Sequence, residues 1–101
     1  MKAEFEFDWD TGNTAKCAKH GLTQAEIEYA LSNGARYAAD PSHSLTEQRF
    51  IALSRTAVGR PVFIAFCWRD GRLRPISARY MHRQEARRHG IQTQDRPGDE
   101  H

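Results

Sequence analysis

Apolar residues are densest in one stretch of the chain, residues 60–82, where their pattern predicts a β-hairpin. Residues 62–68 are rich in β-branched and aromatic types, and the run is long enough for a strand in the middle of a sheet. Asp70 and Gly71 follow it, the pair most typical of a two-residue type I′ turn, in which both residues need a positive φ. Residues 72–80 would then return as the antiparallel partner.

A two-residue turn also predicts the pairing along the hairpin, with Trp68 opposite Leu73 and Phe66 opposite Pro75. Because side chains alternate between faces, one extra residue in the loop would exchange the faces of the partners. Pro75 has no N–H to donate, which favours an edge strand or a bulge at this position. One face would carry Val62, Ile64, Phe66, Trp68, Ser77 and Arg79, and the other, which we expect to face the core, would carry Phe63, Ala65, Cys67, Ile76 and Ala78.

The remaining pattern predicts helices and further strands around this hairpin. Asp10 is a good N-cap for a first helix, and Thr23 with Glu26 has the spacing of a capping box for a second. Gly21 between them is typical of a helix end in the left-handed region. The order of elements predicts an α+β fold, with helices packed on an antiparallel sheet. We expect strands over residues 4–9, 36–39 and 47–55, and helices over residues 11–19, 24–32 and 81–89.

Length and composition indicate one small domain. The 101 residues contain no apolar run of about 18, and the acidic start has no apolar signal segment, so we expect a soluble cytoplasmic protein with no membrane contact. We assign the folded domain to residues 1–90 and a disordered polar tail to residues 91–101. Cys17 and Cys67 form no disulfide framework, and we expect two reduced, buried thiols.

The charge is distributed unevenly behind a net value of +2. Residues 1–48 carry four basic and eight acidic residues, a net charge of −4, whereas residues 49–90 carry ten arginines and two acids, a net charge of +8. A basic half made of arginine favours a polyanion or an acidic partner, and arginine is the residue suited to bidentate phosphate binding. A solvated charged face is the alternative interpretation.

Several of these residues are candidates for proton transfer or phosphate binding. Lys19 and His20 end the first helix, where an imidazole could transfer a proton, although C-capping by polar side chains explains them as well. Arg49, Arg55 and Arg79 could converge on one phosphate if their strands are neighbours. The same arginines could also be edge-strand charges that oppose aggregation.

Stacking and metal binding are two further possibilities. Trp68 and Tyr80 lie among the arginines, as readers of single-stranded RNA require for base stacking, although packing in the core is the alternative. His82, Glu85 and His89 share a helix face, but a strong third ligand is missing, so we expect no metal site. A Gly-rich phosphate loop, a nucleophile elbow and paired carboxylates are also missing, so we expect no cofactor.

Three separated motifs resemble the BrnT toxin family, and the match as a whole spans about residues 7–89. They are F-x-W-D-x-G-N-x-x-K-C-x-K-H-G-L (residues 7–22), E-x-R-F-I-A-L-x-R-T-x-x-G-R-P-V-F (residues 47–63) and R-P-I-S-A-R-Y-M-H (residues 74–82). The family is similar in fold to RelE-type ribonuclease toxins. The resemblance therefore implies RNA cleavage that blocks translation, and a ribbon-helix-helix antitoxin that masks the site and represses the operon. Contact with DNA would be only indirect, through that antitoxin.

The motifs match Lys19, His20, Arg49, Arg55 and Arg79 to residues of the family, and the roles that follow are our own hypothesis from their chemistry. His20 would transfer protons in a metal-independent attack of the RNA 2′-OH on the adjacent phosphate. Lys16, Lys19, Trp68, Tyr80 and His82 would bind the substrate, and Arg49, Arg55 and Arg79 would hold the phosphate. We expect a heterotetramer with the antitoxin. Two alternatives stay open: a helix-turn-helix DNA-binding module, disfavoured because residues 24–32 carry two acids and no base, and a degenerate toxin kept as an antitoxin-binding partner.

Overall fold

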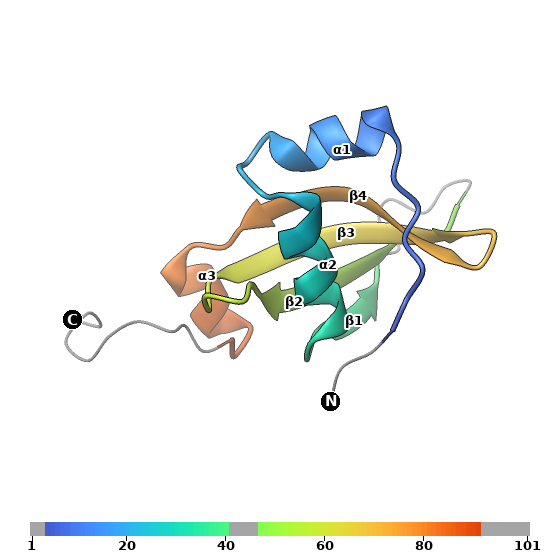
Figure 1. The fold of residues 1–101 in the computed structure, drawn as a ribbon. Coiled ribbons are helices and arrows are strands. Elements are labelled where there is room, and N and C mark those ends of the chain that lie inside the picture. Colours follow the sequence, from blue (N-terminus) through green and yellow to red (C-terminus); the bar gives the residue numbers. More distant parts are fainter. Residues whose placement is uncertain (1–3, 41–46, 92–101) are drawn as a thin grey trace.

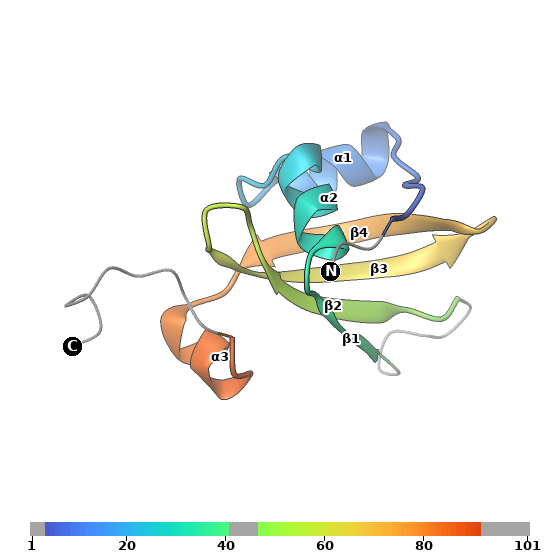
Figure 2. The same ribbon diagram turned by 60° about the horizontal axis from the view of Figure 1, so that its bottom comes forward.

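The computed structural model describes residues 4–40 and 47–91, which form an α+β fold of three helices and a four-stranded antiparallel sheet. The strands lie in the order β1-β2-β3-β4 (Figure 1). Figure 2 shows α1 and α2 on one face of the sheet and α3 below one end of the other face. The elements are α1 (Thr11–Ala18), α2 (Gln24–Ser32), β1 (Arg36–Ala39), β2 (Phe50–Arg55), β3 (Pro61–Arg69), β4 (Arg72–Tyr80) and α3 (Arg83–Arg88).

Both N-terminal helices begin at the predicted caps. The Asp10 carboxylate accepts a hydrogen bond from the Asn13 N–H at 3.0 Å, and the Asn13 side chain accepts one from the Asp10 N–H at 2.7 Å. Thr23 and Glu26 make the same reciprocal pair at the start of α2. Gly21, with a φ of +88°, follows α1 in the left-handed region. The local sequence therefore defines this pair of helices, as expected.

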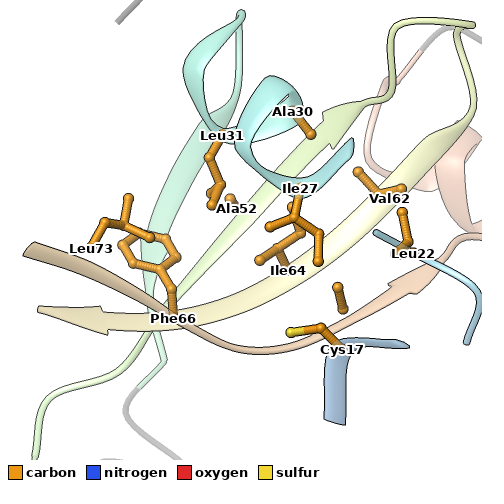
Figure 3. Close-up of a cluster of buried hydrophobic side chains, with 11 residues drawn as sticks. Cys17, Leu22, Ile27, Ala30, Leu31, Ala52, Val62, Ile64, Phe66 and Leu73 are labelled. Atoms are coloured by element: carbon orange, nitrogen blue, oxygen red, sulfur yellow. The ribbon is translucent and has the colours of Figure 1, made fainter. Parts of the chain in front are cut away.

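The hydrophobic core lies between these two helices and the inner face of the sheet. Ile27, Ala30 and Leu31 of α2 are fully buried, and Figure 3 shows them facing side chains from the strands. Phe66 extends the core along β3, where it stacks on Phe50 at 5.6 Å between ring centroids. The fully or nearly fully buried members are Cys17, Leu22, Ile27, Ala30, Leu31, Ala52, Val62, Ile64, Phe66, Leu73 and Ala78.

The predicted core face of the hairpin is wrong, and a β-bulge explains the error. Pairing starts as expected, with Trp68 opposite Leu73 and Phe66 opposite Pro75. The register then shifts by one residue, so that Ala65 pairs with Ser77 and Ile76 is the extra residue. Ala78 therefore lies on the core face with Val62, Ile64 and Phe66. Ser77 and Arg79, which were predicted on that face, lie on the opposite side with Phe63 and Ala65. Pro75 lies directly before the extra residue. It has no N–H to donate to the ladder, and proline within sheets is found at edge strands and bulges for this reason.

Other boundaries differ more modestly from the sequence-based expectation. Residues 4–9 form only a bridge between Phe7 and Leu73, although Phe5, Phe7 and Trp9 do pack against the core. Strand β2 starts three residues later than predicted, and α3 is shorter at both ends. Of residues 91–101, to which we assigned a disordered tail, Ile91 is described and donates its N–H to the Ala86 carbonyl at 2.8 Å, and residues 92–101 lie outside the described residues. Within residues 4–40 and 47–91 we find no helix with the length and apolarity needed to span a membrane.

Candidate functional site

The sheet face turned away from α1 and α2, here called the open face, carries most of the predicted phosphate-binding residues. Residues paired directly across neighbouring strands point to the same side of a sheet. The pairs Arg36–Leu53, Leu53–Phe63 and Phe63–Arg79 therefore form one row across all four strands. Within the described strands this pairing places Arg36, Ala38, Ile51, Leu53, Arg55, Pro61, Phe63, Ala65, Ser77 and Arg79 on the open face, followed toward the hairpin turn by Cys67, Arg69, Arg72 and Arg74.

Arg79 lies beneath α3 and is bound by it. Its guanidinium donates to both carboxylate oxygens of Glu85 at 2.8 Å each, and its carbon Cζ lies 4.5 Å from the centroid of the Phe63 ring. The hydrogen bond from Arg79 lowers the pKa of the Glu85 carboxyl, and in turn the Glu85 carboxylate raises the pKa of Arg79. Ala86, the next residue, is fully buried. The ion pair therefore helps to hold α3 against the open face.

Arg55 lies at the same end of the open face as Arg79, and Arg49 lies at the other. Arg55 is two residues beyond Leu53, which shares a row with Arg79. Arg49 precedes β2 and is six residues from Arg55, about 20 Å along an extended strand. The fold thus brings Arg55 and Arg79 to one end and places Arg49 away from them.

His20 approaches this end from the helix side of the sheet. It follows Lys19 in the exposed turn between α1 and α2, which Figure 1 places near the end of β4. The next helix begins there, and Glu26 accepts a hydrogen bond from the Tyr80 hydroxyl at 3.4 Å. Since Tyr80 and Arg79 are successive strand residues, they point to opposite faces. His20 and Arg79 therefore approach the end of β4 from different sides.

The predicted stacking residues are not neighbours. Tyr80 pairs with Val62, six residues before Trp68 on β3, which is about 20 Å along the strand. One face of the Tyr80 ring is covered by Arg60, whose Cζ lies 3.5 Å from the ring centroid. Trp68 is 43% exposed and packs edge-on against Phe5 at 5.8 Å between ring centroids. The two aromatic rings could therefore contact only different nucleotides.

The outer residues of the predicted site are exposed. Lys16 lies in the last turn of α1, and His82 is the N-cap residue of α3 without a side-chain capping hydrogen bond. Glu85 faces Arg79 and not a metal ligand set with His82 and His89. In the part of the chain that the structure describes, no three His, Cys, Asp or Glu side chains gather closely enough to hold a metal ion.

Three residues at this end were missed by sequence reasoning. Arg36 joins the row on the open face from β1, and Arg60 covers Tyr80 from the connection between β2 and β3. Glu85 was considered only as a metal ligand, but it is the partner of Arg79. Arg36 could have been noticed as the single arginine of the acidic half, placed at the start of a predicted strand.

The interpretation of α1 and α2 as a DNA-binding helix-turn-helix gains no support from the structure. Helix α2 packs its apolar side on the sheet, and its carboxylates are bound within the protein, Glu26 to Thr23 and Glu28 to the Trp9 indole N–H at 2.8 Å. It has no basic residue to offer to phosphates.

Comparisons with known proteins identify the family of this chain. A search of curated proteins finds no match to this chain. A family model described as the ribonuclease toxin BrnT of a type II toxin-antitoxin system matches residues 9–85. The matched region contains α1, α2, the whole sheet and the Arg79–Glu85 pair. The chain therefore belongs to the BrnT family of ribonuclease toxins from type II toxin-antitoxin systems.

Proposed function

We propose that this protein is a metal-independent endoribonuclease that cleaves RNA through attack of the 2′-OH, and that it thereby inhibits translation in the cytoplasm. The observation that carries the proposal is the concentration of arginines at one end of an open sheet face, in a chain of a ribonuclease-toxin family. Arg55 and Arg79 lie on the sheet itself, and α3 adds Arg83, Arg87 and Arg88.

Arg79 is the residue to which we assign the scissile phosphate, and Arg55, at the same end of the open face, would hold a neighbouring phosphate of the RNA. Negative charge builds up on the phosphoryl oxygens as the 2′-OH attacks, and fixed cations there lower the barrier. Arg79 already binds a carboxylate in a bidentate geometry, which is also the geometry in which a guanidinium binds phosphate. A phosphate can therefore take the place of the Glu85 carboxylate on the same two N–H groups.

The reaction also needs a base for the 2′-OH proton and an acid for the leaving 5′-oxygen. We assign proton transfer to His20 from its chemistry and from the position of its turn near the end of β4. Because Arg79 lies on the opposite side of the sheet, the RNA would have to pass around this end of β4 to meet both residues. Lys16, Lys19, Tyr80 and His82 would contact the RNA around this end. Arg49 lies about 20 Å from Arg55, and Trp68 lies about 20 Å from Tyr80, along the strands. Both Arg49 and Trp68 would contact nucleotides farther along the RNA.

The test is cleavage of an RNA by the purified protein, compared with a DNA of the same sequence and with the same RNA carrying 2′-O-methyl groups. We expect cleavage of the unmodified RNA only, with a 2′,3′-cyclic phosphate on the 5′ product. Arg79→Ala should lower the rate by about 10²-fold, the usual effect of removing one group that stabilises the transition-state charge. Arg79→Lys should fail as well if the contact is bidentate.

A matched control is available at the opposite end of the sheet. Arg72 is exposed beside the hairpin turn, with only a 3.9 Å contact to Glu6, so Arg72→Ala removes the same charge without touching the site. Equal cleavage by the Arg79→Ala and Arg72→Ala variants, or cleavage of the 2′-O-methyl RNA, would overturn the proposal.

A type II toxin has an antitoxin partner, and we propose that this one is a ribbon-helix-helix protein that covers the open face and joins two toxins in a heterotetramer. The basic charge of residues 49–90 supports a partner with an acidic or carbonyl-rich covering segment. Co-expression followed by a mass measurement tests the stoichiometry. A one-to-one complex would contradict the heterotetramer. An association rate that does not change with salt would contradict an antitoxin attracted by the basic charge of this face.

A further inference from the structure

A pocket of about 300 Å³ lies beside the proposed catalytic end, at the edge of the sheet formed by β1 and β2. Its walls come from four parts of the chain: the end of α2, the start of β1, the end of β2 and the turn after α3. Arg36 and Arg55 reach it from neighbouring strands, and Gly34 and Gly90 form parts of its wall. Arg36 has no role in the proposed function above.

The pocket is chemically suited to an anion. Two guanidiniums line it, and none of its described lining residues is acidic. The other polar side chains have their donors directed to the protein, since the Ser54 hydroxyl donates to the Ala30 carbonyl at 2.7 Å and the Asn33 amide donates to the Tyr29 carbonyl at 2.8 Å. A guanidinium has five N–H donors, so Arg55 can keep a contact within the protein and still bind an oxyanion.

Two glycines form parts of the pocket wall in a backbone conformation that favours glycine. Gly34 and Gly90 have φ values of +76° and +71°, a region in which glycine is favoured. A Cβ atom built on Gly34 would meet no atom within 4 Å, and one built on Gly90 would lie 4.0 Å from a terminal nitrogen of Arg36. The Arg36 guanidinium therefore lies beside the main chain at Gly90, with space in front of Gly34.

The pocket lies within reach of an RNA strand whose scissile phosphate is bound at Arg79. Arg36 and Arg79 end the same row of paired residues, three strand spacings or about 14 Å apart. Helix α3 lies between them, bound to Arg79 by Glu85 and followed by Gly90 at Arg36. A strand of RNA that places one phosphate at Arg79 can therefore reach the pocket with another, on the far side of α3.

We propose that the Arg36–Arg55 pocket is a subsite for a phosphate of the RNA other than the scissile one. Arginine pairs bind phosphate oxygens in bidentate fashion, and the pocket has the volume for a phosphate with its ribose. The proposal rests on the proposed ribonuclease function, and it deepens that function by naming a residue that binds the substrate away from the reacting bond.

Three measurements test the subsite. Titration with inorganic phosphate should shift the backbone amide signals of Gly34 and Gly90 in the NMR spectrum of the wild-type protein, and Arg36→Ala should abolish the shifts. The affinity for a short 2′-O-methyl RNA should fall about tenfold in Arg36→Ala, and the slope of log K against log salt should fall by about 0.7. In the cleavage assay Arg36→Ala should raise KM and leave kcat unchanged.

Controls separate binding from folding and from the source of the phosphate. Arg72→Ala removes an arginine at the other end of the sheet and should match the wild type in all three measurements. Arg36→Lys keeps the charge, so it should restore the melting temperature if Arg36→Ala lowers it, but not the amide shifts. The RNA subsite would be overturned in favour of a free nucleotide by two results together. A mononucleotide would bind as tightly as the RNA, and Arg36→Ala would leave the affinity for the RNA unchanged.

The outcomes for the subsite and for the ribonuclease function are distinct. Absence of Arg36-dependent amide shifts would overturn the subsite even if the protein cleaves RNA. Amide shifts and Arg36-dependent binding of 2′-O-methyl RNA, in a protein that leaves unmodified RNA intact, would support the subsite and overturn the nuclease.

Discussion

Replacing Glu85 by Gln should both loosen α3 and strengthen RNA binding. The substitution keeps the size of the side chain but removes the charge that Arg79 binds through two hydrogen bonds. The Glu85 side chain is 15% exposed and that of Arg79 is 41% exposed, so solvent screens the pair and its contribution is that of a surface ion pair. The bidentate geometry places it at the upper end of that range, about 1 kcal/mol, or a fall of about 4–8 °C in Tm for a domain of this size.

The pH dependence of this loss has a definite sign. Because Arg79 lowers the pKa of Glu85 in the folded state, the ion pair contributes its full stability above the unfolded carboxyl pKa of about 4.3. That contribution disappears as the pH falls through the lower, folded pKa. The difference in free energy of unfolding between the wild type and Glu85→Gln should therefore be constant around pH 7 and vanish near pH 2.

A double-mutant cycle with Arg79→Ala, read by urea unfolding, is the appropriate assay. We expect a coupling energy of about 0.5–1 kcal/mol between the two positions at pH 7. In parallel, Glu85→Gln should bind 2′-O-methyl RNA more tightly than the wild type, because phosphate no longer competes with a carboxylate for Arg79. A coupling energy near zero, or a deficit in stability that persists at pH 2, would refute the ion-pair reasoning. Weaker RNA binding would refute the competition.

Three further predictions concern the scaffold and the chemistry. Asn13→Ala should lower the free energy of unfolding, measured by urea denaturation, by about 2–3 kcal/mol. The buried Asn13 amide donates to the carbonyls of Asp8 and Pro75, and the substitution leaves the Pro75 carbonyl without this donor. Cys17 and Cys67 should react with iodoacetamide at pH 7.5 only after unfolding, since both are buried and burial raises the pKa of Cys17 to about 11; fast modification of the native protein would contradict this. RNA cleavage should continue in excess EDTA, and loss of activity restored by zinc or magnesium would disprove metal independence.

The parts of the fold that could be predicted depend on neighbours in sequence. The caps at Asp10 and Thr23 each need only residues three positions away, so the starts of α1 and α2 were predicted correctly. The Asp70–Gly71 turn similarly determines the first pairs of the hairpin. Pro75 indicated an edge strand or a bulge, but the apolar pattern did not show which of the two to expect, and the hairpin was therefore predicted with uninterrupted pairing.

The same distinction explains what the sequence revealed about the site. Arginines on predicted strands could be identified as phosphate ligands from their chemistry alone. Which of them lie together depends on the order and register of the strands, and this separates Arg49 from Arg55 and adds Arg36 from β1. Glu85 lies six residues after Arg79 and across the break between β4 and α3, so no periodic spacing relates the two.

The extra residue in β4 also has a consequence for how this fold can vary. In uninterrupted pairing that kept Ile76, Ser77 would lie opposite Ile64 and Arg79 opposite Val62, so Arg79 would enter the apolar interior. The bulge prevents this, because it takes up one residue and returns Ser77 and Arg79 to the side of Ala65 and Phe63. Deleting Ile76 would leave these pairs unchanged, since Ser77 would then follow Pro75 directly and still lie opposite Ala65. The distance in sequence from the Asp70–Gly71 turn to this arginine can therefore shorten by one residue without moving its guanidinium to the other face.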